Sequence, residues 1–212
     1  MDLIHPKVQL YAEEFSSPED GLLKELSDHT NKHHPESHML SGHLQGKLLE
    51  AVSFMIRPRR ILEIGTFTGY SALCLAKGLS EDGQLHTIEM REEDNRKARE
   101  YFDRSPFKEK IILHTGSALN ILPVLAETWD LIFIDADKTG YIDYFNLVLP
   151  NLRKNGFILA DNIFFHGQVF EEPVKGKSAK AIKAFNEMIK KRHDIDTVVL
   201  TIRDGLFLIR KL

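Results

Sequence analysis

The spacing of hydrophobic positions along the chain changes near residue 58. Through residues 1–58, apolar side chains recur every three or four positions on a polar background, which predicts amphipathic helices. From Arg60 onward, short apolar runs alternate with amphipathic stretches, a pattern typical of a mostly parallel sheet with helices on both faces. Strands are predicted at 60–64, 84–89, 111–114, 131–135 and 157–161, with helices beginning near Tyr70, Glu92, Leu119 and Tyr141.

This alternation stops near the C-terminus. After a predicted helix at 178–192, the strand-like runs 197–202 and 206–210 flank Asp204-Gly205, a pair typical of antiparallel hairpins. We therefore predict an open α/β sheet that ends in a hairpin, with ligands beyond the carboxyl ends of its parallel strands. One domain is expected over 1–212, with a helical lid or flank at 1–58 and the sheet core at 59–212.

Composition narrows the class of protein. With 212 residues and 42% hydrophobic content, the chain can form one sizeable core. A formal net charge of -3 gives no general reason to expect nucleic acid or an anionic membrane as the main partner, so a small molecule is expected.

The single Cys74 rules out an internal disulfide, and we predict that it is a small buried hydrophobe. No signal peptide or bilayer-length apolar run is evident, so we expect a cytoplasmic protein.

Charged and amide side chains follow two of the predicted strands. Asp135, Asp137 and Lys138 end the run Asp-Leu-Ile-Phe-Ile-Asp-Ala-Asp-Lys, and a second run ends in Asp161-Asn162. If the two strands are parallel neighbours, these groups meet at one edge of the sheet. Carboxylate and amide oxygens without cysteine suit Mg²⁺, Mn²⁺ or Ca²⁺ better than zinc. The sequence thus outlines a site for a divalent cation and proton transfer.

A glycine-containing loop follows the first predicted strand and opens a helix. Its Gly65-x-x-x-Gly69 spacing is not a dinucleotide fingerprint, and a turn that requires positive φ would explain it equally well. Glu63, just ahead of it, would repel a pyrophosphate and attract a cation or an amino group. Glu89 ends the second strand, where an acid either binds a ribose or caps the following helix. S-adenosylmethionine, with a sulfonium, an amino group and a ribose diol, fits these charges.

Several motifs then occur in one order. They are Glu-Ile-Gly-Thr-Phe-Thr-Gly-Tyr-Ser at 63–71, Gly-Ser-Ala at 116–118, Ile-Asp-Ala-Asp-Lys at 134–138, Tyr-x-x-Tyr at 141–144 and Asp161-Asn162. Over residues 35–212 the chain resembles the cation-dependent O-methyltransferases of the caffeoyl-CoA and catechol type. The resemblance implies a Rossmann-like class I methyltransferase fold with a seven-stranded sheet, S-adenosylmethionine as methyl donor, and a homodimer.

The resemblance also assigns roles to particular residues. Those placed around the cofactor are Met39, Ser41, Glu63, Gly65, Ser71, Glu89, Ala118, Asp135 and Asp137. The implied ligands of one divalent cation are Asp135, Asp161 and Asn162. Two adjacent hydroxyls of a catechol-like acceptor would occupy further positions on that ion, which would lower the pKa of the reacting hydroxyl.

Lys138 is the predicted general base, beside Asp135 as the second catalytic residue. A divalent cation and a sulfonium nearby would lower the pKa of Lys138. The alternative is a solvated lysine that pairs with Asp137 or Asp143. Asn162 and Lys138 would also meet the acceptor, and Phe165 with His166 would line its ring pocket.

Other readings of the sequence stay open. A nicotinamide oxidoreductase fits the fold class but not the glycine spacing, and a non-catalytic S-adenosylmethionine-binding protein would leave Lys138 unexplained. Five histidines between His29 and His43 lack the spacing of a zinc site and are interpreted as polar loop or lid residues, with His38 and His43 as candidates to face the site. Basic residues between 175 and 192 indicate a solvated helix face or, alternatively, contact with the phosphates of a tRNA whose hydroxylated uridine is methylated.

Overall fold

The computed structural model describes residues 3–212 and contains one seven-stranded sheet at its centre. The strand order is β3-β2-β1-β4-β5-β7-β6, in which β7 alone runs antiparallel to the other strands. The strands are β1 Arg60–Ile64, β2 Gln84–Glu89, β3 Ile111–Thr115, β4 Trp129–Ile134, β5 Leu152–Asp161, β6 Ile195–Leu200 and β7 Leu206–Lys211. The predicted α/β sheet with a C-terminal antiparallel hairpin is confirmed.

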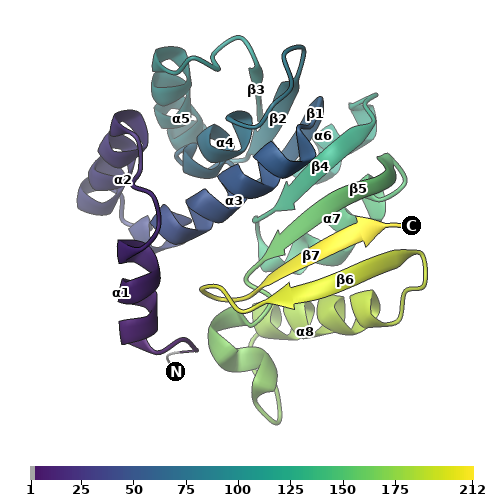
Figure 1. Ribbon diagram of the computed structural model, residues 1–212. Helices are drawn as coiled ribbons and strands as arrows, with labels where there is room; N and C mark the ends of the chain where they lie inside the picture. The colour runs from purple at the N-terminus through teal and green to yellow at the C-terminus, as the bar shows by residue number, and fades with distance from the viewer. Residues whose placement is uncertain (1–2) are drawn as a thin grey trace.

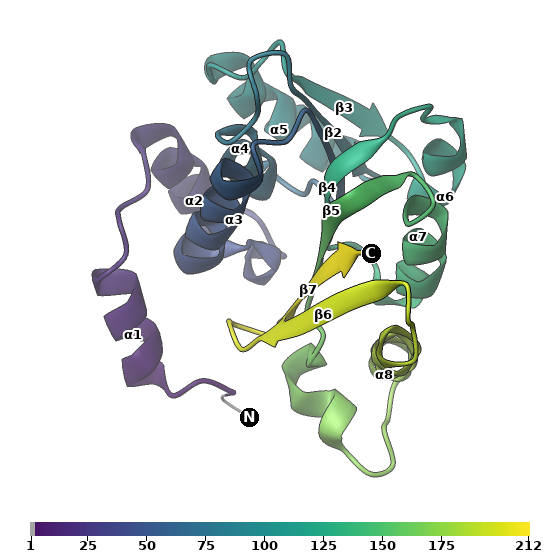
Figure 2. The same ribbon diagram turned by 45° about the vertical axis from the view of Figure 1, so that its right-hand side comes forward.

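Helices cover both faces of the sheet (Figures 1 and 2). One face carries α3 Gly42–Ile56, α4 Tyr70–Ala76 and α5 Glu92–Arg104, and the other carries α6 Ala118–Ile121, α7 Tyr141–Val148 and α8 Lys177–Lys190. Side chains of β4 alternate between the two layers: Leu131 and Phe133 enter one core, while Ile132 and Ile134 enter the other. This two-sided burial explains why the central strands are continuous apolar runs in the sequence.

The N-terminal residues form three helices and a short turn. Helix α1 (Pro6–Glu14) has no buried residue, whereas α2 (Gly21–His33) buries Leu23 and Leu26 in the core shared with α3 and α4. A 3₁₀ turn, η1 (Ser37–Met39), then leads to the start of α3. This path brings residues 38–41 to the wall of a cavity at the edge of the sheet. No helix in the described part of the chain has the length and apolar character needed to cross a bilayer.

The observed elements differ from the predicted ones mainly at their ends. Strand β5 begins at Leu152 rather than at 157, and its register with β4 shifts between Trp129 and Leu131. Polar residues 153–155 lie in this first part of β5 and gave no apolar signal. The hairpin also has a longer connection than a two-residue Asp-Gly turn, because β6 ends at Leu200. In that connection the Gly205 N–H donates to the Ile202 carbonyl at 2.9 Å.

Candidate active site at the carboxyl ends of the strands

A cavity of about 610 Å³ lies beyond the carboxyl ends of the parallel strands. Residues from the N-terminal segment, the chain after each of β1, β2, β3, β4 and β5, the start of α8 and the β6–β7 connection line it. The predicted site residues on its wall are Met39, Ser41, Gly65, Ser71, Glu89, Ala118, Asp135, Asp137, Lys138, Asp161, Asn162, Phe165 and His166. Residues far apart in sequence are thus brought together where the fold class places ligands.

The loop after β1 lies against the end of β4. Gly65 has φ +102°, and a Cβ on it would lie 1.9 Å from the Asp135 carbonyl oxygen. The Asp135 N–H donates in turn to the Ile64 carbonyl at 2.9 Å. Only glycine allows this close approach, which places the first loop and the first acid of the site side by side.

Glu63 is the one predicted cofactor residue that does not reach the cavity wall. Its side chain is fully buried on β1, where Oε2 accepts a hydrogen bond from the Thr87 hydroxyl. Oε1 has no hydrogen-bond partner among the described residues. Burial raises the pKa of Glu63 to about 8; the nearby Ser71 and Thr87 hydroxyls oppose this shift, and repulsion from Asp135 and Glu89 adds to it. A buried acid with a free acceptor atom is chemically suited to a cationic amino group, but the contact of Glu63 with the cofactor stays a prediction.

Glu89 is held at the end of β2 by backbone donors. Its Oε2 accepts from the Phe67 N–H at 2.8 Å, and its Oε1 accepts from the Arg91 N–H at 3.0 Å. These bonds orient the carboxylate beside the cavity, as a ribose-binding role requires. The second bond also joins Glu89 to Arg91, the residue before α5, where no side chain of the described residues caps the first turn of the helix.

The three predicted cation ligands lie together at the ends of β4 and β5. Ile134 pairs with Ala160 across the parallel strands, so Asp135 and Asp161 are the next residues on neighbouring strands. Asp161 is only 4% exposed; its Oδ1 accepts from the Asn162 N–H and its Oδ2 from the Gln45 side-chain amide, each at 2.8 Å. The Asn162 amide nitrogen donates to Asp204 at 3.3 Å, which leaves its oxygen available to an ion.

The electrostatics of this cluster favour a divalent cation. Burial and the neighbouring Asp135 carboxylate raise the pKa of Asp161, because two negative charges lie close together away from water. Two carboxylates and an amide oxygen form a hard donor set without sulfur, which suits Mg²⁺, Mn²⁺ or Ca²⁺. The residues present therefore fit such an ion.

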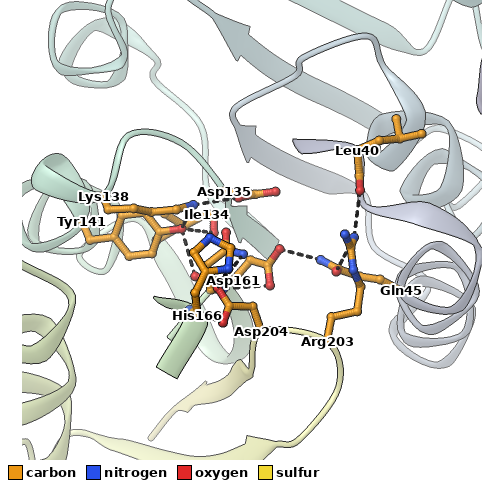
Figure 3. A network of polar contacts seen from close by, with 11 residues as sticks. Leu40, Gln45, Ile134, Asp135, Lys138, Tyr141, Asp161, His166, Arg203 and Asp204 are labelled. Carbon is orange, nitrogen blue, oxygen red and sulfur yellow. Dashed lines mark hydrogen bonds and ion pairs between the residues drawn. The ribbon is translucent and has the colours of Figure 1, made fainter. Parts of the chain in front are cut away.

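Lys138 is tied to the same cluster. Its Nζ donates to Asp135 Oδ1 and to the Tyr141 hydroxyl, each at 2.9 Å, and Tyr141 donates to the Asp161 carbonyl at 3.0 Å (Figure 3). Burial lowers the pKa of Lys138, but Tyr141, Asp135 and Asp161 raise it by more, so the ligand-free protein holds a lysine cation. The predicted lowering concerns the loaded site and stays a prediction. The expected alternative partners, Asp137 and Asp143, do not pair with Lys138.

The acceptor end of the cavity has an unusual backbone. Phe165 and His166 lie shortly after Asp161 and Asn162, two of the predicted cation ligands, and have positive φ of 44° and 55°. The His166 N–H donates to Asp204 at 2.6 Å, while its ring is 69% exposed. Phe165 and His166 both line the cavity, and their role as an aromatic wall with a polar edge against the acceptor stays a prediction.

Sequence reasoning missed several residues that support this site. Gln45 was only a polar position within an amphipathic run, yet it is 1% exposed and bonded to Asp161. Asp204 was interpreted as a turn residue, although it holds both Asn162 and the backbone of His166. Arg203, beside it, lines the cavity and carried no sequence signal at all.

The histidines near residue 38 take separate places. His38 lines the cavity, whereas the His43 ring contacts the Ser17 carbonyl at 2.7 Å and not the site. The His34 ring lies 3.0 Å from Asp94 and packs edge-on against Phe67. In residues 3–212, no group of three His, Cys, Asp or Glu side chains is arranged to hold a metal, so a cation bound at Asp135 and Asp161 would need Asn162 as its third protein ligand.

Comparison with known proteins decides the family. The family model described as O-methyltransferase matches residues 13–212. The chain belongs to the O-methyltransferase family. The resemblance predicted from the ordered motifs is therefore confirmed.

Relatives of this O-methyltransferase share much of its length. It is 34% identical over 160 residues to a catechol O-methyltransferase of Niastella koreensis, covering 74% of this chain and 72% of the relative. A probable caffeoyl-CoA O-methyltransferase of Dictyostelium discoideum is 30% identical, with coverage of 95% and 90%. Among solved structures, the S-adenosylhomocysteine-bound methyltransferase PaMTH1 of Podospora anserina has a TM-score of 0.90 and 30% identity, covering 97% of this chain and 94% of that one.

Proposed function

We propose that this O-methyltransferase transfers the methyl group of S-adenosylmethionine to one hydroxyl of a catechol-like small molecule and requires a divalent cation. The observation that carries the proposal is the convergence of Asp135, Asp161, Asn162 and Lys138 on one cavity, which the predicted cofactor residues also line. The names of the relatives support the acceptor class, and the bound product in the Podospora structure supports the donor.

The side chains of the site divide the work. Asp135, Asp161 and Asn162 would hold Mg²⁺, Mn²⁺ or Ca²⁺, which when bound lowers the pKa of a phenolic hydroxyl. Lys138, fixed by Tyr141, would take the proton that this hydroxyl loses. Glu63 would pair with the amino group of the cofactor and Glu89 with its ribose. Phe165 and His166 would orient the acceptor ring, so that positioning supplies much of the rate.

A methyl-transfer assay over a panel of acceptors tests the proposal. Chelator-treated protein is offered caffeate, protocatechuate, a caffeoyl thioester and a monophenol, each with and without Mg²⁺. We expect turnover only with the vicinal diols and only with Mg²⁺, since a monophenol presents one oxygen. Equal rates with and without the ion, or equal use of the monophenol, would contradict the proposed mechanism.

A tRNA with a hydroxylated uridine is the second candidate acceptor. Its support is a set of exposed lysines, Lys175, Lys177 and Lys180, near Ser178, which lines the cavity. Phe170, which precedes these lysines in sequence, is 62% exposed, but Phe185 on α8 is buried, so the described residues of α8 offer no array of aromatic side chains on which bases could stack, and we favour the small molecule. Methylation of this tRNA, with no turnover of any catechol in the same assay, would reverse the order.

A homodimer and a cytoplasmic location complete the proposal. The homodimer follows from the family resemblance, and its test is the mass of the purified protein in solution. The location is supported by Cys74, which is buried and unpaired, since a lone reduced cysteine is typical of reducing compartments.

A further inference from the structure

The β6–β7 connection contacts the N-terminal segment, and both line the cavity. Arg203 lies in this connection, and its Nη1 donates to the Leu40 carbonyl at 2.8 Å and to the Ser41 carbonyl (Figure 3). The same nitrogen donates to Gln45 Oε1 at 3.3 Å. One guanidinium therefore ties the segment that would cover the cofactor to the first turn of α3.

Gln45 continues these contacts into the cation site. Its Oε1 faces Arg203 and its Nε2 donates to Asp161 Oδ2, so both ends of the buried amide are engaged. Asp161 then has one protein donor on each carboxylate oxygen, Gln45 on Oδ2 and the Asn162 N–H on Oδ1. These two bonds fix the plane of the carboxylate, and hence the direction from which an ion can approach it.

Arg203 is an uncommon residue for its position. Its φ is +47°, in the left-handed region that side chains other than glycine rarely adopt. Among residues 3–212 no carboxylate lies within ion-pair distance of its guanidinium; its hydrogen-bond partners are two carbonyls and one amide. Strained backbone of this kind is found where the surroundings impose it, often at functional sites. Within the part of the chain that the structure describes, the Arg203 side chain thus forms no surface ion pair. It instead connects the N-terminal segment to Gln45, which contacts the cation site.

We propose that Arg203 and Gln45 are positioning residues that couple closure of the N-terminal segment over the cofactor to the geometry of the cation site. The proposal rests on the cation dependence proposed above. When S-adenosylhomocysteine binds and orders the segment around Met39 and Ser41, it also fixes the Leu40 and Ser41 carbonyls, which accept hydrogen bonds from Arg203. Arg203 then orients Gln45, and Gln45 orients Asp161. By linkage, the adenosyl ligand and the cation must strengthen each other's binding.

Mn²⁺ binding, followed by the electron paramagnetic resonance of the free ion, tests this coupling without requiring turnover. It is measured with and without S-adenosylhomocysteine for the unsubstituted protein, Arg203→Gly and Gln45→Met. Glycine suits the positive φ, so the first variant removes the side chain without backbone strain. Arg57→Gly is the matched control, because Arg57 also has positive φ, at 50°, and is exposed outside the cavity. Thermal unfolding shows that each variant is folded.

We expect S-adenosylhomocysteine to tighten Mn²⁺ binding by the unsubstituted protein and by Arg57→Gly by about fivefold or more. Arg203→Gly and Gln45→Met should bind Mn²⁺ roughly tenfold more weakly, as other supporting residues of metal sites do when replaced. Both should also lose most of the tightening. Unchanged affinity and tightening in folded variants would overturn this proposal alone. Failure of the unsubstituted protein to bind Mn²⁺ would overturn it together with the proposed cation dependence.

Discussion

At the scale of single residues, Glu63 has opposing effects on the stability of the fold and on the binding of a cationic ligand. Its free Oε1 is an acceptor in an apolar environment, which a cationic ligand would satisfy. Until such a ligand binds, burial holds the pKa of Glu63 near 8, so the side chain is largely neutral at pH 7. A group of this kind lowers stability in exchange for binding. The two effects can be separated by removing its charge.

Glu63→Gln should gain stability while it loses cofactor affinity. The folded pKa, about 8, lies above the usual value of 4.5, so the unfolded state ionises first and stability falls as pH rises between these values. Glutamine does not ionise, so the variant's advantage in melting temperature should grow from about pH 5 to about pH 8. Binding of S-adenosylmethionine should weaken by roughly tenfold or more, from loss of a charged hydrogen bond. A variant that is less stable than the unsubstituted protein at the upper pH would contradict this account.

Lys138→Ala should separate catalysis from binding. Loss of the proposed base should lower kcat by roughly 10²-fold or more. Mn²⁺ should bind at least as tightly, because the lysine cation no longer pairs with Asp135. Turnover is measured beside Mn²⁺ and S-adenosylhomocysteine binding, so that a folding defect is visible. Retained turnover would exclude Lys138 as the base.

At the scale of elements, the site depends on how closely the ends of β1 and β4 approach. Gly65 permits this contact, and the Asp135 carbonyl would collide with any Cβ there. The positions of Asp135 and of the cofactor loop are therefore set by the same pair of strands. Replacing Gly65 should therefore affect the stability of the fold and the binding of both the cofactor and the cation.

Gly65→Ala should destabilise the fold by roughly 2 kcal/mol more than Gly176→Ala, from overpacking against backbone. Gly176 is the matched control, because it also has positive φ, at +80°, but has open space around it. Urea denaturation measures both differences. Equal losses would show that backbone strain, and not the approach of β1 to β4, determines the requirement for glycine.

The sequence predicted those elements whose burial leaves a simple pattern. The bounds of strands β1 and β2 were predicted to the residue, because a strand that is buried on one or both faces shows a recognisable pattern of apolar residues in the sequence. The first residues of β5 were missed, since 153–155 are polar, and the hairpin connection was taken as a two-residue turn. Residues at strand ends were found through the order of the motifs. Gln45 and Arg203 were not, because their contacts join segments about 160 residues apart.

At the scale of the whole molecule, the sheet edge collects two kinds of chemistry in one cavity. The N-terminal segment and the loops after β1, β2 and β3 supply most of the groups proposed for the cofactor, and the ends of β4 and β5 supply those proposed for the cation (Figure 1). The N-terminal segment and the β6–β7 connection meet over both. The proposed chemistry thus depends on one ion bound by oxygen atoms from the ends of two neighbouring strands.

A crystal of the protein soaked with Mn²⁺ and S-adenosylhomocysteine tests this claim most directly, through anomalous scattering at the manganese edge. We predict a single peak about 2.2 Å from oxygen atoms of Asp135, Asp161 and Asn162, close to the sulfur of the bound product and with Lys138 turned from Asp135. A map with the product in place, no anomalous peak between these side chains and the Lys138–Asp135 pair still formed would contradict the account.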